Sequence, residues 1–159
     1  MKLFLKQSAV LIGVSLILGL LVNAVRPEGI PLLAQELPTL ELASTDGTEN
    51  EPAIAIISLE QAKKFYDGGI LFIDARHDEY YRDGHIRNAF RSDDFMGLLY
   101  VLDSMSVMKQ DPIVTYCDGD ECGSSEELAY DLQASGFQKI YVFKGGWSDW
   151  VSAGFPTDQ

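Results

Sequence analysis

Residues 113–132 decide the fold, and they read IVTYCDGDECGSSEELAYDL. The first four, Ile113–Tyr116, are a short apolar run with β-branched residues, which is typical of a buried strand. Apolar residues then recur at helical spacing from 124 to 132, and Gly136 follows as a stop signal. The stretch therefore predicts a strand, a glycine-bearing loop and a helix, with Cys117 directly after the strand.

The same alternation of strands and helices continues on both sides of this stretch. Further apolar runs that suit buried strands lie at 53–57, 70–73 and 140–143. Helices are predicted between them: one opened by a capping box at 58–61 that closes near Gly68, one over 95–105, and one capped by Ser124 to Glu127. Strands alternating with helices imply a parallel sheet covered by helices on both faces, so the predicted fold class is α/β.

Cys117 is the main candidate for chemistry. In sheets of this kind the ligand site lies beyond the carboxyl ends of the strands, where Cys117 follows its strand. Unpaired N–H groups at a helix N-terminus favour a thiolate, and they equally favour an anionic persulfide resting in the loop. The alternative is that Cys117 is simply a small buried residue at a strand end.

Several short motifs accompany this cysteine. They are, in chain order, FIDAR at 72–76, EY at 79–80, GHIRNA at 84–89, VTYC at 114–117, SEELAYDL at 125–132, GGW at 145–147, and Trp150, Gly154 and Pro156. In this order they resemble the rhodanese-like (sulfurtransferase) domain family. The resemblance covers nearly all of residues 53–157 and implies a three-layer domain with a central parallel sheet.

The resemblance also implies a mechanism. Cys117 would take a sulfane sulfur from a small donor such as thiosulfate, hold it as a persulfide cradled by backbone N–H groups of the loop, and pass it to a thiol acceptor. No cofactor is expected. The residues expected to serve as structural motif rather than chemistry are Asp74, Arg76, His85, Gly146 and Trp147.

The loop departs from the family pattern. The stretch from Cys117 to Ser125 is two residues longer than usual, and Ser124 stands where an arginine is expected. The loop residues are Asp118, Gly119, Asp120, Glu121, Gly123 and Ser124. Their three carboxylates oppose the helix end by raising the pKa of a nearby thiol, and they repel thiosulfate. We therefore expect poor use of thiosulfate.

Cys122 is the second thiol of the loop and leaves alternatives open. A disulfide with Cys117 is sterically feasible if the two Cα atoms approach within about 7 Å, and it would mask the nucleophile. Cys122 would otherwise resolve a persulfide or sulfenate on Cys117, or only pack inside the loop. Zinc bound by Cys117, Asp120 and Cys122 is a weaker alternative, and no metal is predicted.

The N-terminal part carries a targeting signal. Lys2 and Lys6 precede an apolar run over 9–22, which makes residues 1–26 a signal anchor, or a signal peptide cleaved after Ala24. Residues 27–52 are a Pro-rich acidic linker, and residues 53–157 form the rhodanese-like domain. The basic residues before the run place the domain on the periplasmic or another extracytoplasmic side.

Charge and motifs together define the expected function. The formal net charge is -12, which argues against binding nucleic acid through its phosphates. We expect a membrane-tethered sulfurtransferase or sulfane-sulfur carrier that forms a persulfide on Cys117. The alternatives are a thiol–disulfide redox module using Cys117 and Cys122, and a non-catalytic binding domain that reuses the fold.

Overall fold

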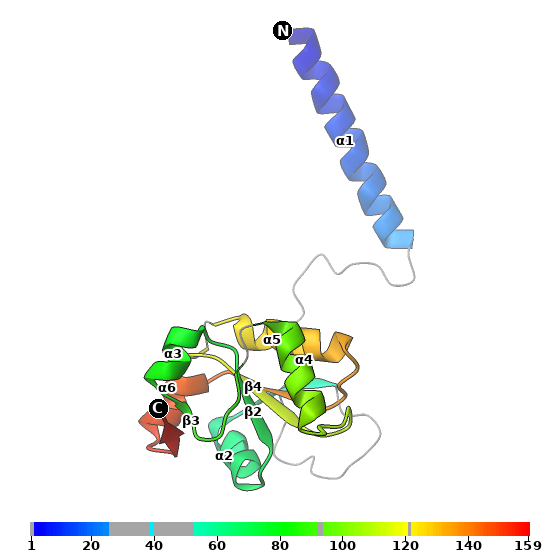
Figure 1. The fold of residues 1–159 in the computed structure, drawn as a ribbon. Helices are drawn as coiled ribbons and strands as arrows, with labels where there is room; N and C mark the ends of the chain where they lie inside the picture. The colour runs from blue at the N-terminus through cyan, green and yellow to red at the C-terminus, as the bar shows by residue number, and fades with distance from the viewer. Residues whose placement is uncertain (1, 26–38, 40–52, 92–93, 121) are drawn as a thin grey trace. The chain divides into compact units, whose positions relative to one another are not determined.

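The computed structural model describes residues 2–25, 39, 53–91, 94–120 and 122–159 (Figure 1). The chain divides into two compact units, Met1–Glu36 and Leu37–Gln159. The predicted linker 27–52 lies outside the described residues except for Thr39, which forms an isolated parallel bridge with Ile56.

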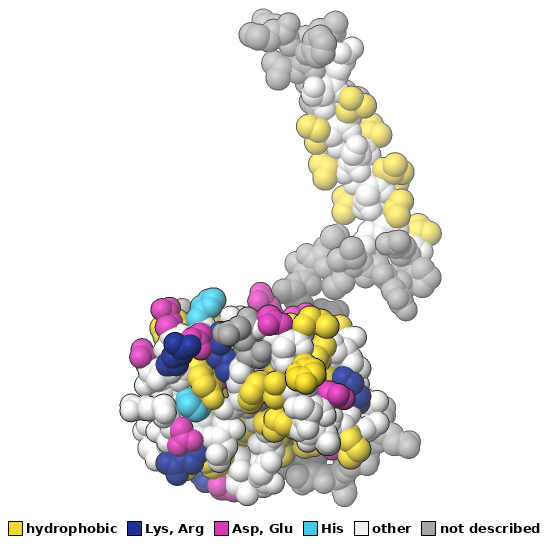
Figure 2. Space-filling model, viewed as in Figure 1, with side chains coloured by type: hydrophobic (Ala, Val, Ile, Leu, Met, Phe, Trp, Pro, Cys, Tyr) yellow, Lys and Arg dark blue, Asp and Glu magenta, His cyan; other side chains and the backbone are white. Residues whose placement is uncertain are grey.

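The first unit contains one long apolar helix, α1 (Lys2–Val25). Its segment Lys6–Val25 has 20 residues and a mean hydropathy of 2.4, and none of it is buried. Figure 2 shows hydrophobic side chains exposed along this helix. At 1.5 Å per residue, 20 residues span about 30 Å, the thickness of a bilayer core. By length and composition α1 can cross a membrane, and an N-terminal signal sequence has the same character.

The second unit is built around a four-stranded parallel sheet. Its strands are β1 (Ile54–Ile57), β2 (Leu71–Asp74), β4 (Ile113–Tyr116) and β5 (Ile140–Phe143), in the order β1-β5-β4-β2. All three pairings are parallel. Every residue of β4 is buried, because β4 is an inner strand with helices over both faces. The predicted parallel α/β sheet is therefore confirmed.

Helices cover the two faces in separate layers (Figure 1). On one face α4 (Phe95–Ser104) and α5 (Ser124–Ala134) bury Leu98, Leu102, Ala129 and Leu132 against the sheet. On the other face α2 (Leu59–Asp67) and α6 (Gly146–Ser152) bury Ala62 and Trp150. These two apolar clusters give the three layers that the sequence predicts.

The start of α2 agrees with its sequence signature. Ser58 is the N-cap, and its side chain accepts a hydrogen bond from the Gln61 N–H while the Gln61 side chain accepts one from the Ser58 N–H. This is the reciprocal capping box, and it satisfies two donors at the helix start. The C-cap is Gly68, as predicted.

The predicted cap of α5 is wrong. Gly123 occupies the N-cap position and no side chain caps the helix. Ser124 and Ser125 instead lie in the first helical turn, where Ser125 is buried against β4 and its carbonyl accepts a hydrogen bond from Thr115 Oγ1 at 2.9 Å. Because Ser125 packs against the strand, it lies within the helix and not at the N-cap. The serine-rich segment therefore begins the helix but does not cap it.

Several short elements complete the unit. They are α3 (Asp78–Asp83), β3 (His85–Ile86) and β6 (Thr157–Asp158), the last two forming a separate antiparallel pair. These elements and α6 have no strong periodicity of their own, because each has at most seven residues. They bring the C-terminal residues back beside the segment that follows β2.

Candidate active site

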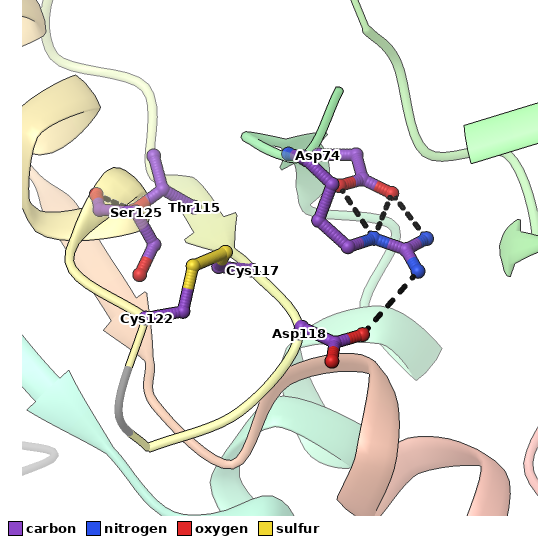
Figure 3. Close-up of a disulfide and its surroundings, with 7 residues drawn as sticks. Asp74, Thr115, Cys117, Asp118, Cys122 and Ser125 are labelled. Atoms are coloured by element: carbon purple, nitrogen blue, oxygen red, sulfur yellow. Dashed lines mark hydrogen bonds and ion pairs between the residues drawn. A yellow bond between two sulfur atoms is a disulfide. The ribbon is translucent and has the colours of Figure 1, made fainter. Parts of the chain in front are cut away.

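Two neighbouring strands end at the same edge of the sheet and bring the candidate residues together. Asp74 at the end of β2 pairs in register with Tyr116 at the end of β4, and Cys117 is the next residue. Figure 3 shows Asp74 on one side and Cys117 with its loop on the other. Cys117 thus lies at the carboxyl edge of the parallel sheet, where ligand sites of this fold class form.

Cys117 and Cys122 are joined by a disulfide across the loop (Figure 3). Their Cα atoms are 6.1 Å apart, and Cys117 is 3% exposed while Cys122 is half-buried. Of the alternatives for Cys122, the structure therefore adopts the loop disulfide. Both sulfurs are engaged in it, so in this state neither is a free nucleophile or a metal ligand.

The first turn of α6 holds the base of the loop. The Trp147 N–H donates to the Cys117 carbonyl at 2.8 Å, and the Ser148 N–H donates to the Asp118 carbonyl at 2.9 Å. Gly146 has φ +56°, and a Cβ there would collide with the Cys117 carbonyl oxygen. Gly146 thus combines a backbone conformation that favours glycine with a close approach that excludes any side chain.

Beside the loop lies a buried ion pair. Arg76 Nη2 is 2.7 Å from Asp74 Oδ2 and also donates to the Gly84 carbonyl at 2.7 Å, while Arg76 Nε donates to both Asp74 oxygens. The Arg76 and Asp74 side chains are 4% and 0% exposed. The Tyr116 hydroxyl donates to Asp74 Oδ2 at 2.7 Å and accepts from the Ile86 N–H at 3.2 Å.

This network shifts the pKa values of Arg76 and Tyr116. Burial lowers the pKa of Arg76, but the hydrogen bond and charge of Asp74, with smaller effects of Tyr116 and Asp118, outweigh it and raise the pKa overall. Burial, followed by the charge and hydrogen bond of Asp74, raises the pKa of Tyr116. Arg76 therefore stays a cation and Tyr116 a neutral hydrogen-bond donor.

Arg76 links the segment that follows β2 to the cysteine loop that follows β4. Its guanidinium carbon lies 4.9 Å from the centre of the Trp147 ring, and its Nη1 is 3.8 Å from Asp118 Oδ1. Asp118 is otherwise open to solvent, with a side chain 71% exposed. The sequence motifs predict that Arg76 and Trp147 are structural, and the structure places both against the cysteine loop.

The remaining predicted residues occupy distinct places. The described part of the loop includes Gly119, Asp120, Gly123 and Ser124. Glu121 lies outside the described residues. The Cys122 N–H donates to the Gly119 carbonyl at 3.0 Å, which closes the turn. His85 lies away from the sulfurs: its Nδ1 is 3.0 Å from the Tyr81 carbonyl and its ring stacks on Tyr81.

A cavity of about 310 Å³ adjoins the loop, and no pattern in the sequence predicts it. Its lining includes Arg76, Arg91, Ser124 and Glu127. Arg91 Nε donates to the Arg76 carbonyl at 2.8 Å, and Arg91 Nη1 is 3.4 Å from Asp78. Arg91 lies between strands and helices in the sequence, and nothing there indicates that it approaches Arg76.

Together these features describe a three-layer α/β domain with a cysteine loop at the end of an inner parallel strand. The model of the rhodanese-like domain family matches residues 58–153. The chain therefore belongs to the rhodanese-like domain family, as its motifs predict.

Individual relatives agree with this assignment. Rhodanese-like domain-containing protein 17 of Arabidopsis thaliana is 25% identical over 129 residues, 73% of this chain and 80% of that protein. The tRNA uridine(34) hydroxylase of Onion yellows phytoplasma is 31% identical over 126 residues, which are 77% of this chain and 37% of the hydroxylase. The crystal structure of the Alr3790 protein from Anabaena sp. has a TM-score of 0.53 and 28% identity, covering 64% of this chain and 89% of that one.

Proposed function

We propose that this protein is a sulfurtransferase or sulfane-sulfur carrier in which Cys117 forms a persulfide. The position of Cys117 carries the proposal: it follows the inner strand β4 at the carboxyl edge of the sheet and lies at the foot of the loop that enters α5. The N–H groups of Ser124 and Ser125 precede the first helical hydrogen bond and have no intrahelical acceptor. They favour an anionic sulfur at this place.

The reaction begins once the disulfide is reduced. The Cys117 thiolate attacks the outer sulfur of a sulfane donor, the donor's sulfur–sulfur bond breaks, and its electron pair leaves with the rest of the donor. A thiol acceptor then attacks the outer sulfur of the persulfide and restores the Cys117 thiolate. Asp118 and the acidic loop disfavour anionic donors, so we expect small donors of low charge to be preferred.

We propose that α1 attaches the domain to a membrane, with the domain on the extracytoplasmic side. The length and apolarity of α1 support the attachment. Lys2 and Lys6 before the apolar run support the orientation. The loop disulfide is of a kind that persists in oxidising compartments such as the periplasm. The net charge of -12 disfavours binding to nucleic acid. We therefore do not propose a nucleic-acid substrate for this chain on the basis of its similarity to the hydroxylase.

A second candidate function rests on the disulfide itself. A short loop with two cysteines, one buried and one half-buried, is suited to reversible thiol–disulfide exchange with a partner protein. In that case electrons rather than sulfur atoms would be transferred, and Cys122 would be as necessary as Cys117.

The test is the intact mass of the full-length protein in mild detergent. The protein is reduced, freed of reductant, exposed to polysulfide or thiosulfate, and treated with a thiol-blocking reagent. We expect a gain of one sulfur atom from polysulfide, and little from thiosulfate, in the wild type and in Cys122→Ala, and none in Cys117→Ser. No gain, with return of the disulfide under mild oxidation, would favour the redox module. Two fully alkylated thiols under every condition would indicate a binding domain.

A further inference from the structure

We propose that hydrosulfide is a direct sulfur source for this site, and that the Cys117–Cys122 disulfide is the oxidant that converts it to a persulfide. The inference rests on the proposed function, because it requires that Cys117 carry sulfane sulfur. It adds the substrate class and a role for Cys122. Two observations support it: the charge beside the loop and the unequal burial of the two cysteines.

Charge beside the loop disfavours a doubly charged donor. Thiosulfate needs cationic partners. Arg76 is a described cation in contact with the loop, 3.8 Å from Asp118, and Arg91 lines the adjoining cavity, where it is 3.4 Å from Asp78. The Arg76 guanidinium is already bound to Asp74, to the Gly84 carbonyl and to Asp118. Hydrosulfide carries one charge, and its neutral conjugate acid, hydrogen sulfide, carries none. The acidic loop therefore excludes hydrosulfide much less than thiosulfate.

Burial decides which sulfur is attacked first. Cys117 is 3% exposed and Cys122 is half-buried, so the incoming nucleophile reaches Cys122 more easily. Attack on Cys122 releases Cys117 as the leaving thiolate, and Cys117 is the cysteine that carries sulfur in the proposed function.

The chemistry balances in two steps. Hydrosulfide attacks Cys122 Sγ, the Sγ–Sγ bond breaks, and its electron pair leaves on Cys117 as a thiolate. Cys122 then holds a persulfide. The Cys117 thiolate attacks the outer sulfur of that persulfide, and the inner sulfur leaves as the Cys122 thiolate, which takes up the proton of the original hydrosulfide. The disulfide has been reduced, the sulfide sulfur has been oxidised to sulfane sulfur, and no other reactant is consumed.

The second step is favoured by proximity. The Cα atoms of the two cysteines are 6.1 Å apart, a separation that already permits a bond between their sulfurs. Transfer within the loop is therefore intramolecular. It is the same reaction as in the proposed function, with the Cys122 persulfide as the sulfur donor. Each disulfide supports one transfer, after which the loop contains one persulfide and one thiol.

The experiment compares two forms of the full-length protein in mild detergent without oxygen. The disulfide form receives one equivalent of sodium sulfide, followed by a thiol-blocking reagent. We expect two alkyl groups and one extra sulfur atom per chain, and fragmentation should place the sulfur on Cys117. Cys122→Ala, which has no disulfide, should gain no sulfur from sulfide. The reduced wild type with polysulfide, run in parallel, tests the proposed function.

The outcomes separate the two proposals. Sulfur loading of the reduced form by polysulfide, with none on the disulfide form by sulfide, would overturn this inference and leave the proposed function standing. Loading in neither arm would overturn the proposed function. An extra sulfur that stays on Cys122 would contradict the transfer to Cys117, and a gain of sulfur by Cys122→Ala from sulfide would contradict the role of the disulfide as the oxidant.

Discussion

Two segments leave the same edge of the sheet, and they are held in opposite ways. The segment after β2 is fixed by the buried Asp74–Arg76 pair, whose donors and acceptors are matched by Tyr116 and the Gly84 carbonyl. The loop after β4 carries exposed carboxylates and is fixed by a disulfide and by two hydrogen bonds from α6.

The difference separates scaffold from chemistry. A buried, hydrogen-bonded ion pair is costly to disturb and offers no reactive group to solvent. A disulfide is a strong bond that a thiol nevertheless opens reversibly. The segment after β2 therefore keeps one geometry, while the neighbouring loop contains a bond that can be reduced and formed again.

The largest effect is expected from Arg76→Met. The substitution leaves the fully buried Asp74 carboxylate without its cation, and breaking a buried pair in this way costs about 3–5 kcal/mol. Urea unfolding of the full-length protein, followed by the fluorescence of its tryptophans, measures the loss. The matched control is Arg87→Ala, which removes an exposed pair with Asp158 and should therefore destabilise the protein far less. Equal losses in the two variants would show that the Asp74–Arg76 pair is not the scaffold.

An intermediate effect is expected from Gly146→Ala. Its φ of +56° strains any side chain, and the new Cβ collides with the Cys117 carbonyl, so we expect a loss of roughly 2–4 kcal/mol and impaired sulfur loading. Gly154→Ala is the control, because Gly154 has φ +69° with open space around it. It should cost about 1 kcal/mol and leave loading unchanged. If Gly154→Ala impaired loading equally, the contact between α6 and the loop would be irrelevant.

The smallest effect is expected from reducing the disulfide. It joins residues only 5 positions apart, and closing so short a loop contributes at most about 2 kcal/mol. Unfolding of the wild type with and without reductant measures this contribution, and Cys122→Ala should not respond to reductant at all. A loss larger than that of Arg76→Met would reverse the comparison and make the disulfide a structural bond.

Much of the candidate site follows from local sequence. The apolar run before Cys117 and the glycine-bearing loop after it predict a cysteine at a strand end, and β4 ends at Tyr116 as expected. The sequence motifs predict a structural role for Arg76, but they do not predict which residues its side chain contacts. Its approach to Trp147 could not be predicted, because 71 positions in the chain separate the two residues and the pairing of distant strands brings them together.

The strands, the main helices, the family and the position of Cys117 follow from local sequence, because hydrophobic periodicity, capping boxes and short motifs act between neighbouring residues. The tertiary structure adds the strand order β1-β5-β4-β2, the start of α5 at Gly123 without a side-chain cap, the two hydrogen bonds from α6 to the loop and the disulfide between the two cysteines. These features depend on which distant surfaces pack together. Ser125 illustrates the reason: its local pattern favours a cap, and burial against β4 outweighs that preference.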